Sequence, residues 1–328
     1  MIYTENPVIV VGAGVIGLSV ALQLKLKGYK KVTIVAKYIP GDLCIEYTSP
    51  YAGAHWRSMA PGSNKLLQKF DAVTYDRFMN LAHSSDNPGI MILPSYDYYD
   101  DASSPDITDP WFKDVVRDVG FIHKMLRLKF EFLTEKDGLP HGAQLGHKYT
   151  TVFGLQEDPN VINCTGLGAR YIGGVNDEAV FPTRGQTIVV KATHIKKTIT
   201  HLGTQGINYV IPRSDGTVIL GGTANKHDFN PFPEAQASKT ILEKTLALCP
   251  ELKDQPLDIV KYNVGLRPSR IGGVRIENEL LSKNKKQTIQ VTHGYGHGGF
   301  GVQSSWGCAE YIVQVMQDGL TESKAARL

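Results

Sequence analysis

The chain has 328 residues, of which 42% are hydrophobic and 20% are charged, a composition typical of a soluble globular protein long enough for two domains. Its net charge of +3 is small for this size, and no stretch interleaves dense basic residues with aromatic ones, so nucleic acid is excluded as an expected partner. No apolar run approaches the length of a membrane span, and an expected strand lies too near the N-terminus to leave room for a signal peptide.

The four cysteines are widely separated in the chain: Cys44, Cys164, Cys249 and Cys308. Neither the paired spacing of a metal site nor that of a disulfide framework is present. We therefore expect reduced thiols in an intracellular protein.

The first predicted element is a strand over residues 7–11, PVIVV. The turn GAGVIG follows, then a helix over 18–28 in which Gly28 is the expected C-cap, and then a second strand, KVTIVA, over 31–36. This strand, glycine turn, helix and strand form the context that a dinucleotide-binding fingerprint requires. A nucleotide-free α/β scaffold is the alternative.

Each glycine of the turn has a physical role in that fingerprint. Gly12 permits the tight turn, Gly14 lets a pyrophosphate approach the backbone, and Gly17 lets helix and strand pack closely. The second strand, however, ends at Ala36 or Lys37 where a ribose-binding Asp or Glu is expected. Lys37 would favour a phosphate, as in NADP, or be solvated, and Asp42 is a possible substitute. The fingerprint alone thus leaves the cofactor open.

Later stretches add loops suited to close backbone contact. YTSPYAGAHW (47–56) is a loop of small residues, VINCTGLGAR (161–170) a buried strand running into glycines, and VGLRPSRIGGVRIE (264–277) carries three arginines among glycines. Residues 229–252 predict a proline-containing loop and an amphipathic helix, and residues 276–291 a hairpin with a solvated basic turn at 283–286.

The most glycine-rich stretch lies near the C-terminus. Five glycines occur between Gly294 and Gly301, directly before a predicted helix over 302–317. Glycine lets backbone approach a ligand, and a helix start offers unpaired N–H groups, so we expect a ligand that gains negative charge to lie here. His293 and His297 do not predict a metal site, because a glycine loop does not place them on one face and no third ligand is near.

Taken together and in order, these motifs resemble the D-amino-acid oxidase family of FAD enzymes, which includes D-aspartate oxidase. The matching stretches are VVGAGVIGLS, YTSPYAGAHW, NCTGLGAR, PTRGQ, NYVIP, GGT, VGLRPSR and YGHGGFGVQSSWG, and the likeness is greatest to yeast and fungal members. The resemblance implies an α/β fold with a discontinuous, Rossmann-like FAD-binding domain (1–60, 145–190 and 263–328). A substrate domain with a mainly antiparallel sheet (61–144 and 191–262) completes it.

The resemblance also implies the substrate contacts. Arg267 matches the arginine that clasps the substrate carboxylate, Tyr209 the tyrosine that supports it, and Gly299 the glycine whose carbonyl receives the amino group. Arg270 and Arg275 are expected to be structural. The α-hydrogen leaves as hydride to flavin N5 from a neutral amine, so no residue is assigned as acid or base. The imino acid hydrolyses to a 2-oxo acid and ammonia, and O₂ reoxidises the flavin to give hydrogen peroxide.

The cofactor contacts that the resemblance implies come from four segments. In the fingerprint, the small-residue loop, the NCTG strand end and the glycine loop they are Gly12, Ala13, Gly14, Val15, Ile16, Gly17, Lys37, Thr48, Ser49, Ala52, Gly53, Ala54, Cys164, Thr165, Gly166, Gly296, His297, Gly298, Gly299, Phe300, Gly301, Val302 and Gln303.

Substrate preference depends on the residue after GGT. Where the family commonly has a bulky residue and its D-aspartate branch an arginine, this chain has Ala224, which favours neutral D-amino acids. Lys226, His55 or Arg57 would supply positive charge if D-aspartate were the substrate; otherwise they are solvated surface residues.

One departure from the family affects the adenine side. Only seven residues, GLQEDPN, separate Phe153 from Val161, too few for the strand-and-helix crossover of the relatives. Loose FAD binding, a need for a partner chain, and an inactive, non-catalytic flavin-binding form remain open alternatives.

The C-terminal residues Ala326-Arg327-Leu328 are a variant of the Ser-Lys-Leu peroxisome address. Because a peroxide-producing oxidase belongs beside catalase, we expect the protein in the peroxisome, with the import receptor as a partner. A homodimer is possible.

Overall fold

The computed structural model describes residues 5–86, 88–100, 109–116, 123–127, 160–284 and 287–325. Residues 154–159 of the predicted shortened connection and the C-terminal tripeptide lie outside these residues, so both calls stay predictions.

One half of the fold is a five-stranded sheet in the order β12-β13-β5-β1-β2. β1 pairs in parallel with β2 and β5, β13 is parallel to β5, and β12 pairs antiparallel with β13. The sequence predictions of two N-terminal strands and a C-terminal hairpin are therefore confirmed. The strand bounds are β1 (Val8–Val11), β2 (Val32–Val35), β5 (Asn160–Asn163), β12 (Asn278–Asn284) and β13 (Gln287–His293).

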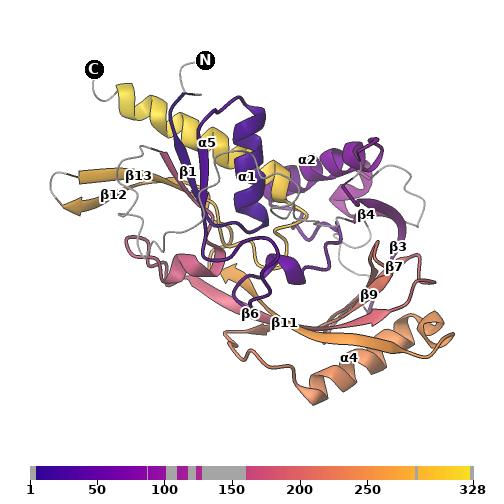
Figure 1. Cartoon of the computed structure of the whole chain (residues 1–328). Helices are drawn as coiled ribbons and strands as arrows, with labels where there is room; N and C mark the ends of the chain where they lie inside the picture. The colour runs from indigo at the N-terminus through magenta and orange to yellow at the C-terminus, as the bar shows by residue number, and fades with distance from the viewer. Residues whose placement is uncertain are drawn as a thin grey trace.

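Helices α1 (Val15–Leu26) and α5 (Ser305–Ala325) pack against this sheet and against each other (Figure 1). Their buried faces form one core with the strands, including Val8, Leu24, Ile162 and Ile312. The predicted helix start at residue 302 is wrong by three residues, because residues 301–304 form turns. α1 starts at Val15, three residues before the predicted start, and its C-cap is Lys27, so the predicted C-cap at Gly28 is wrong by one residue; Gly28 follows with a φ of +86°.

The other half is a curved eight-stranded sheet in the order β10-β6-β9-β8-β7-β3-β4, with β11 also paired to β6. Its pairs are antiparallel except that β3 and β7 run parallel. Helix α4 (Ala235–Leu248), as predicted for residues 229–252, covers its outer face (Figure 1). The strand bounds are β3 (Met91–Tyr99), β4 (His123–Arg127), β6 (Val180–Lys191), β7 (Thr198–Gly203), β8 (Gly206–Pro212), β9 (Thr217–Gly221), β10 (Asn225–Lys226) and β11 (Asp258–Arg270).

Helix α2 (Lys65–Ala82) joins the two halves. The Thr74 hydroxyl on α2 accepts the backbone N–H groups of Trp306 and Gly307, so it caps the N-terminus of α5. A Cβ on Gly307 would lie 2.5 Å from the Phe70 carbonyl oxygen, which shows how closely the two helices cross. α2 packs against both α5 and β4 and so contacts both halves. The domain boundaries proposed from sequence stay a prediction.

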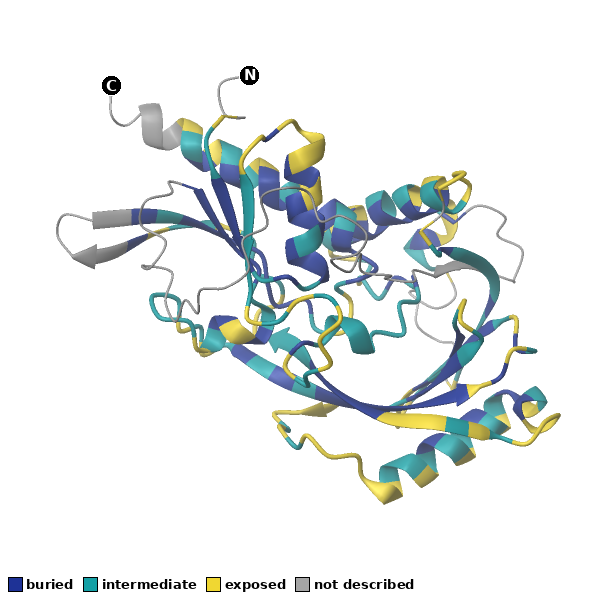
Figure 2. Ribbon diagram, viewed as in Figure 1, coloured by how far each residue is buried: buried dark blue, intermediate teal, exposed yellow. Residues whose placement is uncertain are grey.

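Short 3₁₀ turns complete the described part: η1 (Ser49–Tyr51), η2 (Trp111–Asp114), η5 (Gly166–Arg170) and η6 (Pro250–Lys253). Figure 2 shows the buried residues concentrated in both sheets and in the helix faces turned toward them. Among the helices of the described ranges, none combines the length and apolarity that crossing a membrane needs.

Candidate active site

A cavity of about 1580 Å³ lies between the two sheets. It exceeds the roughly 300–1,000 Å³ of a typical small-ligand pocket, so it has room for a dinucleotide and a substrate together. All of the cofactor residues expected from sequence line it except Gly17, and so do Arg267, Tyr209 and Gly299. The four segments, far apart in the chain, therefore converge on one site.

The first wall is the N-terminus of α1. Gly12 has a φ of +110°, and a Cβ there would lie 2.4 Å from the carbonyl oxygen of Cys164. A Cβ on Gly17 would lie 2.0 Å from the Gly12 carbonyl oxygen, so this glycine allows packing behind the wall, as predicted, and does not face the cavity. The Val15 N–H at this helix start donates to the Ser49 hydroxyl at 3.0 Å, and backbone N–H groups at a helix N-terminus are suited to binding an anion.

Lys37 does line the cavity, but its charge is compensated. Its Nζ lies 2.7 Å from a carboxylate oxygen of Glu46, which also accepts the Tyr38 hydroxyl at 3.0 Å. The Lys37 hydrogen bond holds the pKa of Glu46 below its usual range. The sequence analysis did not identify Glu46, an acid that lies close to the end of β2 through its pairing with Lys37. Its place directly before the YTSP motif was the one sequence feature that pointed to a position in the site. Asp42 also lines the cavity and accepts the Ile39 N–H at 2.9 Å.

The glycine loop forms the middle wall. Gly296 and Gly298 have φ values of +90° and +56°, and the Gly298 N–H donates to the Pro268 carbonyl at 2.9 Å. His297 is buried, with Nε2 2.9 Å from Cys308 Sγ, and burial lowers its pKa to about 4. The imidazole is therefore neutral at physiological pH.

His293 and His297 have different side-chain partners. His293 Nε2 lies 2.9 Å from Glu279, whereas His297 contacts Cys308. Within the described ranges, no group of three His, Cys, Asp or Glu side chains is arranged to hold a metal ion.

The wall continues into the N-terminal turn of α5. Gln303 Nε2 donates to Asp71 Oδ2 at 2.9 Å, and the Ser58 hydroxyl donates to the same oxygen at 2.7 Å. Burial raises the pKa of Asp71 to about 6 despite these bonds. Sequence reasoning had no signal for this carboxyl, because its partners are distant in the chain.

The residues predicted to bind substrate gather at the curved sheet. Arg267 on β11 lies over Gly185, where a Cβ would come 2.3 Å from Nη1, and it donates to the Thr223 carbonyl at 2.9 Å. A Cβ on Gly299 would lie 3.2 Å from Arg267 Cδ, which places the glycine loop against this arginine. Among the described residues no carboxylate pairs with Arg267, and none hydrogen-bonds the Tyr209 hydroxyl. Within the described ranges, Arg267 and Tyr209 thus line the cavity without a carboxylate partner, an arrangement that suits a carboxylate ligand.

The other candidate cations differ in position. Arg57 and His55 line the cavity, but Arg57 Nε pairs with Asp97 at 2.9 Å and Nη2 donates to the Tyr99 hydroxyl at 2.9 Å. The side chains of Arg57 and Asp97 are only 11% and 6% exposed, so this pair is a neutral unit inside the protein. Lys226 is exposed on β10 and is not part of the cavity wall.

A glycine cradle at a helix start, opening onto a cavity lined by an arginine and a tyrosine, is typical of a dinucleotide-dependent protein that acts on a small acid. Residues 7–107 and 124–315 match the family described as FAD dependent oxidoreductase, and the chain belongs to this family. Its cofactor is FAD, and the resemblance seen in the sequence is confirmed.

Named relatives cover nearly the whole chain. It is 32% identical to D-amino-acid oxidase of Schizosaccharomyces pombe, over 92% of this chain and 93% of the relative. It is 30% identical to D-aspartate oxidase of Cryptococcus neoformans, over 94% of this chain and 96% of the relative. That alignment spans 390 positions, more than the 328 residues here, so the relative has residues without a counterpart in this chain.

Among solved structures, glycine oxidase from Bacillus cereus has the same fold. Its TM-score is 0.67 at 19% identity, with 96% of each chain covered.

Proposed function

We propose that this chain oxidises D-amino acids with FAD and O₂, giving 2-oxo acids, ammonia and hydrogen peroxide. The observation that carries the proposal is the Arg267 guanidinium, which has no carboxylate partner in the part of the chain that the structure describes, lines one cavity with Tyr209 and adjoins Gly299 on the glycine loop. The names of the relatives support the choice of D-amino acids as the substrate class.

The residues present fit FAD. The N-terminal turn of α1 would hold the pyrophosphate, because Gly12 permits the tight turn and Gly14, which lines the cavity, lets the pyrophosphate approach the backbone there. Residues 296–303 would lie against the isoalloxazine ring, where the glycines permit close approach of the main chain. Glu46 and Lys37 would meet the ribose and adenine side.

The substrate is held by this chain's own groups. Arg267 offers two parallel N–H bonds to the carboxylate, Tyr209 adds a hydroxyl, and the Gly299 carbonyl accepts the amino group. When bound, FAD supplies the acceptor for the hydride from the α-carbon and passes the electrons to O₂. These three contacts fix the direction of the α-hydrogen, so the L-enantiomer cannot present it in the same way.

Neutral D-amino acids are the favoured substrates. Ala224 leaves room in the cavity wall, Arg57 is neutralised by Asp97, and Lys226 lies outside the cavity. D-Aspartate is the second candidate, because His55 and Arg57 do line the cavity and one relative is named D-aspartate oxidase.

The visible spectrum of the purified protein tests this function. We expect flavin bands that bleach on anaerobic addition of D-alanine, because its carboxylate and amine fit the three contacts, and that persist with L-alanine. Bleaching by D-aspartate alone would instead support the second candidate. Flavin bands that no D-amino acid bleaches, or no bands even with added FAD, would contradict the proposal and favour a non-catalytic flavin- or nucleotide-binding protein.

We also propose a peroxisomal location and self-association. The tripeptide Ala326-Arg327-Leu328 and a peroxide product support the first, with the import receptor as partner. For the second, we place the contact between two copies at β11, where Val260 and Tyr262 are exposed. A fluorescent fusion that stays cytosolic with its last three residues intact would contradict the first proposal. A monomeric mass in sedimentation would contradict the second.

A further inference from the structure

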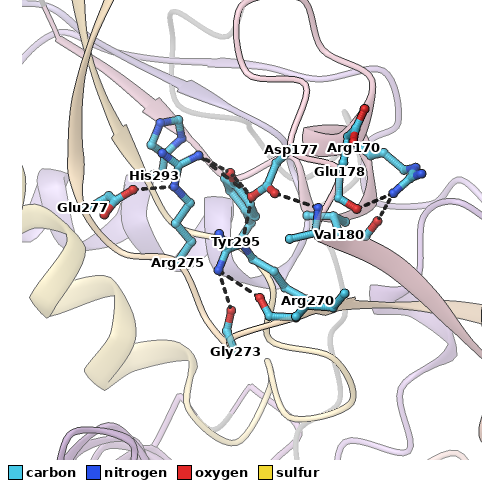
Figure 3. Close-up of polar contacts among 12 residues, drawn as sticks. Arg170, Asp177, Glu178, Val180, Arg270, Gly273, Arg275, Glu277, His293 and Tyr295 are labelled. Atoms are coloured by element: carbon cyan, nitrogen blue, oxygen red, sulfur yellow. Dashed lines mark hydrogen bonds and ion pairs between the residues drawn. The ribbon is translucent and has the colours of Figure 1, made fainter.

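Asp177 lies behind the glycine loop, at the centre of a cluster of charged side chains (Figure 3). Its Oδ2 accepts a hydrogen bond from Arg270 Nε at 2.8 Å and another from the Tyr295 hydroxyl at 2.8 Å. Its Oδ1 accepts the backbone N–H of Ala179 at 3.0 Å. Burial opposes ionisation, but the bonds from Arg270 and Tyr295 outweigh it and lower the pKa of Asp177.

Tyr295 is held by hydrogen bonds at its hydroxyl and at its backbone. Its side chain is buried, and its hydroxyl accepts a bond from Arg275 Nη1 at 2.8 Å while donating to Asp177. Its backbone pairs with Arg275, whose N–H donates to the Tyr295 carbonyl at 2.9 Å. Tyr295 is the second residue of the glycine loop and lines the cavity, so its position sets where the loop begins.

Arg270 connects the same carboxylate to the substrate strand. It lies on β11, three residues after Arg267, and a Cβ on Gly296 would come 2.9 Å from Arg270 Cβ. The side chain therefore packs directly under the glycine loop. Asp177 is thus bonded both to the loop, through Tyr295, and to the strand that carries Arg267, through Arg270.

The remaining members close the cluster on its outer side. Arg275 pairs with Glu277 at 2.6 Å and with Glu279 at 2.8 Å, and Glu279 reaches His293 at 2.9 Å. Burial, and next Arg275, lower the pKa of His293. The Glu277 side chain is more than half exposed at the rim and bonds Arg275 rather than the loop, and its backbone carbonyl accepts the His293 N–H at 2.8 Å.

We propose that Asp177 is a positioning residue, which through Tyr295 and Arg270 fixes the spacing between the flavin-facing glycine loop and the carboxylate-binding Arg267. This inference rests on the proposed function for its kinetic consequence. The geometric part of the inference, which is the position of the glycine loop relative to β11 and bound FAD, does not depend on that function.

Asp177→Asn and Tyr295→Phe test the inference in the FAD-bound full chain. The amide has one oxygen where the carboxylate has two, so it cannot accept from Ala179, Arg270 and Tyr295 together. We expect either variant to shift the absorption maxima and the reduction potential of bound FAD. We also expect the anaerobic bleaching rate at saturating D-alanine to fall about 30- to 100-fold, because displacement of reacting groups by about 1 Å has effects of this size.

Three comparisons separate positioning from general stability. Glu277→Gln removes one carboxylate from the same cluster without touching the loop, so spectrum, potential and rate should stay as in the unmodified protein. The double variant Asp177→Asn, Tyr295→Phe should bleach at a rate within about threefold of that of the slower single variant. The reason is that both substitutions remove the same hydrogen bond between Tyr295 and Asp177. The spectrum and potential are measured without substrate, so they test the inference even if no D-amino acid is oxidised.

Several results would overturn the proposal. An unchanged spectrum, potential and rate in Asp177→Asn would do so, as would a lower melting temperature with normal spectrum and rate. Equal effects of Glu277→Gln would show that cluster charge alone matters. If Asp177→Asn does not fold, Tyr295→Phe, which keeps the buried ring, decides between the same outcomes.

Discussion

Replacing Arg267 with alanine is expected to lower kcat/KM for D-alanine by roughly 10² to 10⁴, with FAD still bound. The estimate follows from two charge-assisted hydrogen bonds to the carboxylate, each contributing about 1.5–3 kcal/mol. In the structure the guanidinium faces the cavity with no carboxylate partner among the described residues, so its binding capacity is available to substrate. Oxygen consumption and the visible spectrum measure activity and cofactor separately.

Arg267→Lys sharpens this test, because lysine keeps the charge and loses the planar fork. We expect it to recover only part of the activity. Lys226→Ala is the control: this lysine is exposed and outside the cavity, so rates should be unchanged. Wild-type turnover in both Arg267 variants would show that the carboxylate binds elsewhere, and Arg57 would be the next residue to change.

Replacing Gly12 with alanine is expected to weaken FAD binding by about 10² or more. Two effects combine: the φ of +110° is strained for an L-residue, and the new Cβ would lie 2.4 Å from the Cys164 carbonyl oxygen. Backbone cannot rotate away as a side chain can, so β1, β5 or the turn into α1 must move from the pyrophosphate site. Titration of the apoprotein with FAD measures the change in affinity, after circular dichroism has established that the variant folds.

Gly41→Ala is the matched control for this prediction. Gly41 has a similar φ of +104°, but no atom lies within 4 Å of its added Cβ. It should therefore lose roughly 1–3 kcal/mol of unfolding free energy from strain alone and bind FAD normally. Equal losses of FAD affinity in both variants would contradict the assignment of Gly12 to the cradle. Unaltered affinity in Gly12→Ala would contradict it as well.

Elements defined by local pattern were predictable from sequence. The N-terminal strand, turn and helix follow from apolar periodicity and from Gly28, and α4 follows from helical spacing over 229–252. The start of α5 was placed three residues early, because its first N–H groups are capped by Thr74, more than 200 residues away. A cap supplied by another helix leaves no local signal.

The features of the site likewise divide into those that the sequence determines and those that only packing decides. The sequence by itself determined the fingerprint, the glycine loop and the family, because short motifs with fixed spacing specify backbone turns and because many of them occur in family order. Only the tertiary structure decided which charges remain available. It paired Lys37 with Glu46 and Arg57 with Asp97, left Arg267 unpaired among the described residues, and brought Asp177 to Arg270 and Tyr295. The physical reason is that a side chain's charge is compensated by neighbours that packing brings close, and sequence spacing does not encode those neighbours.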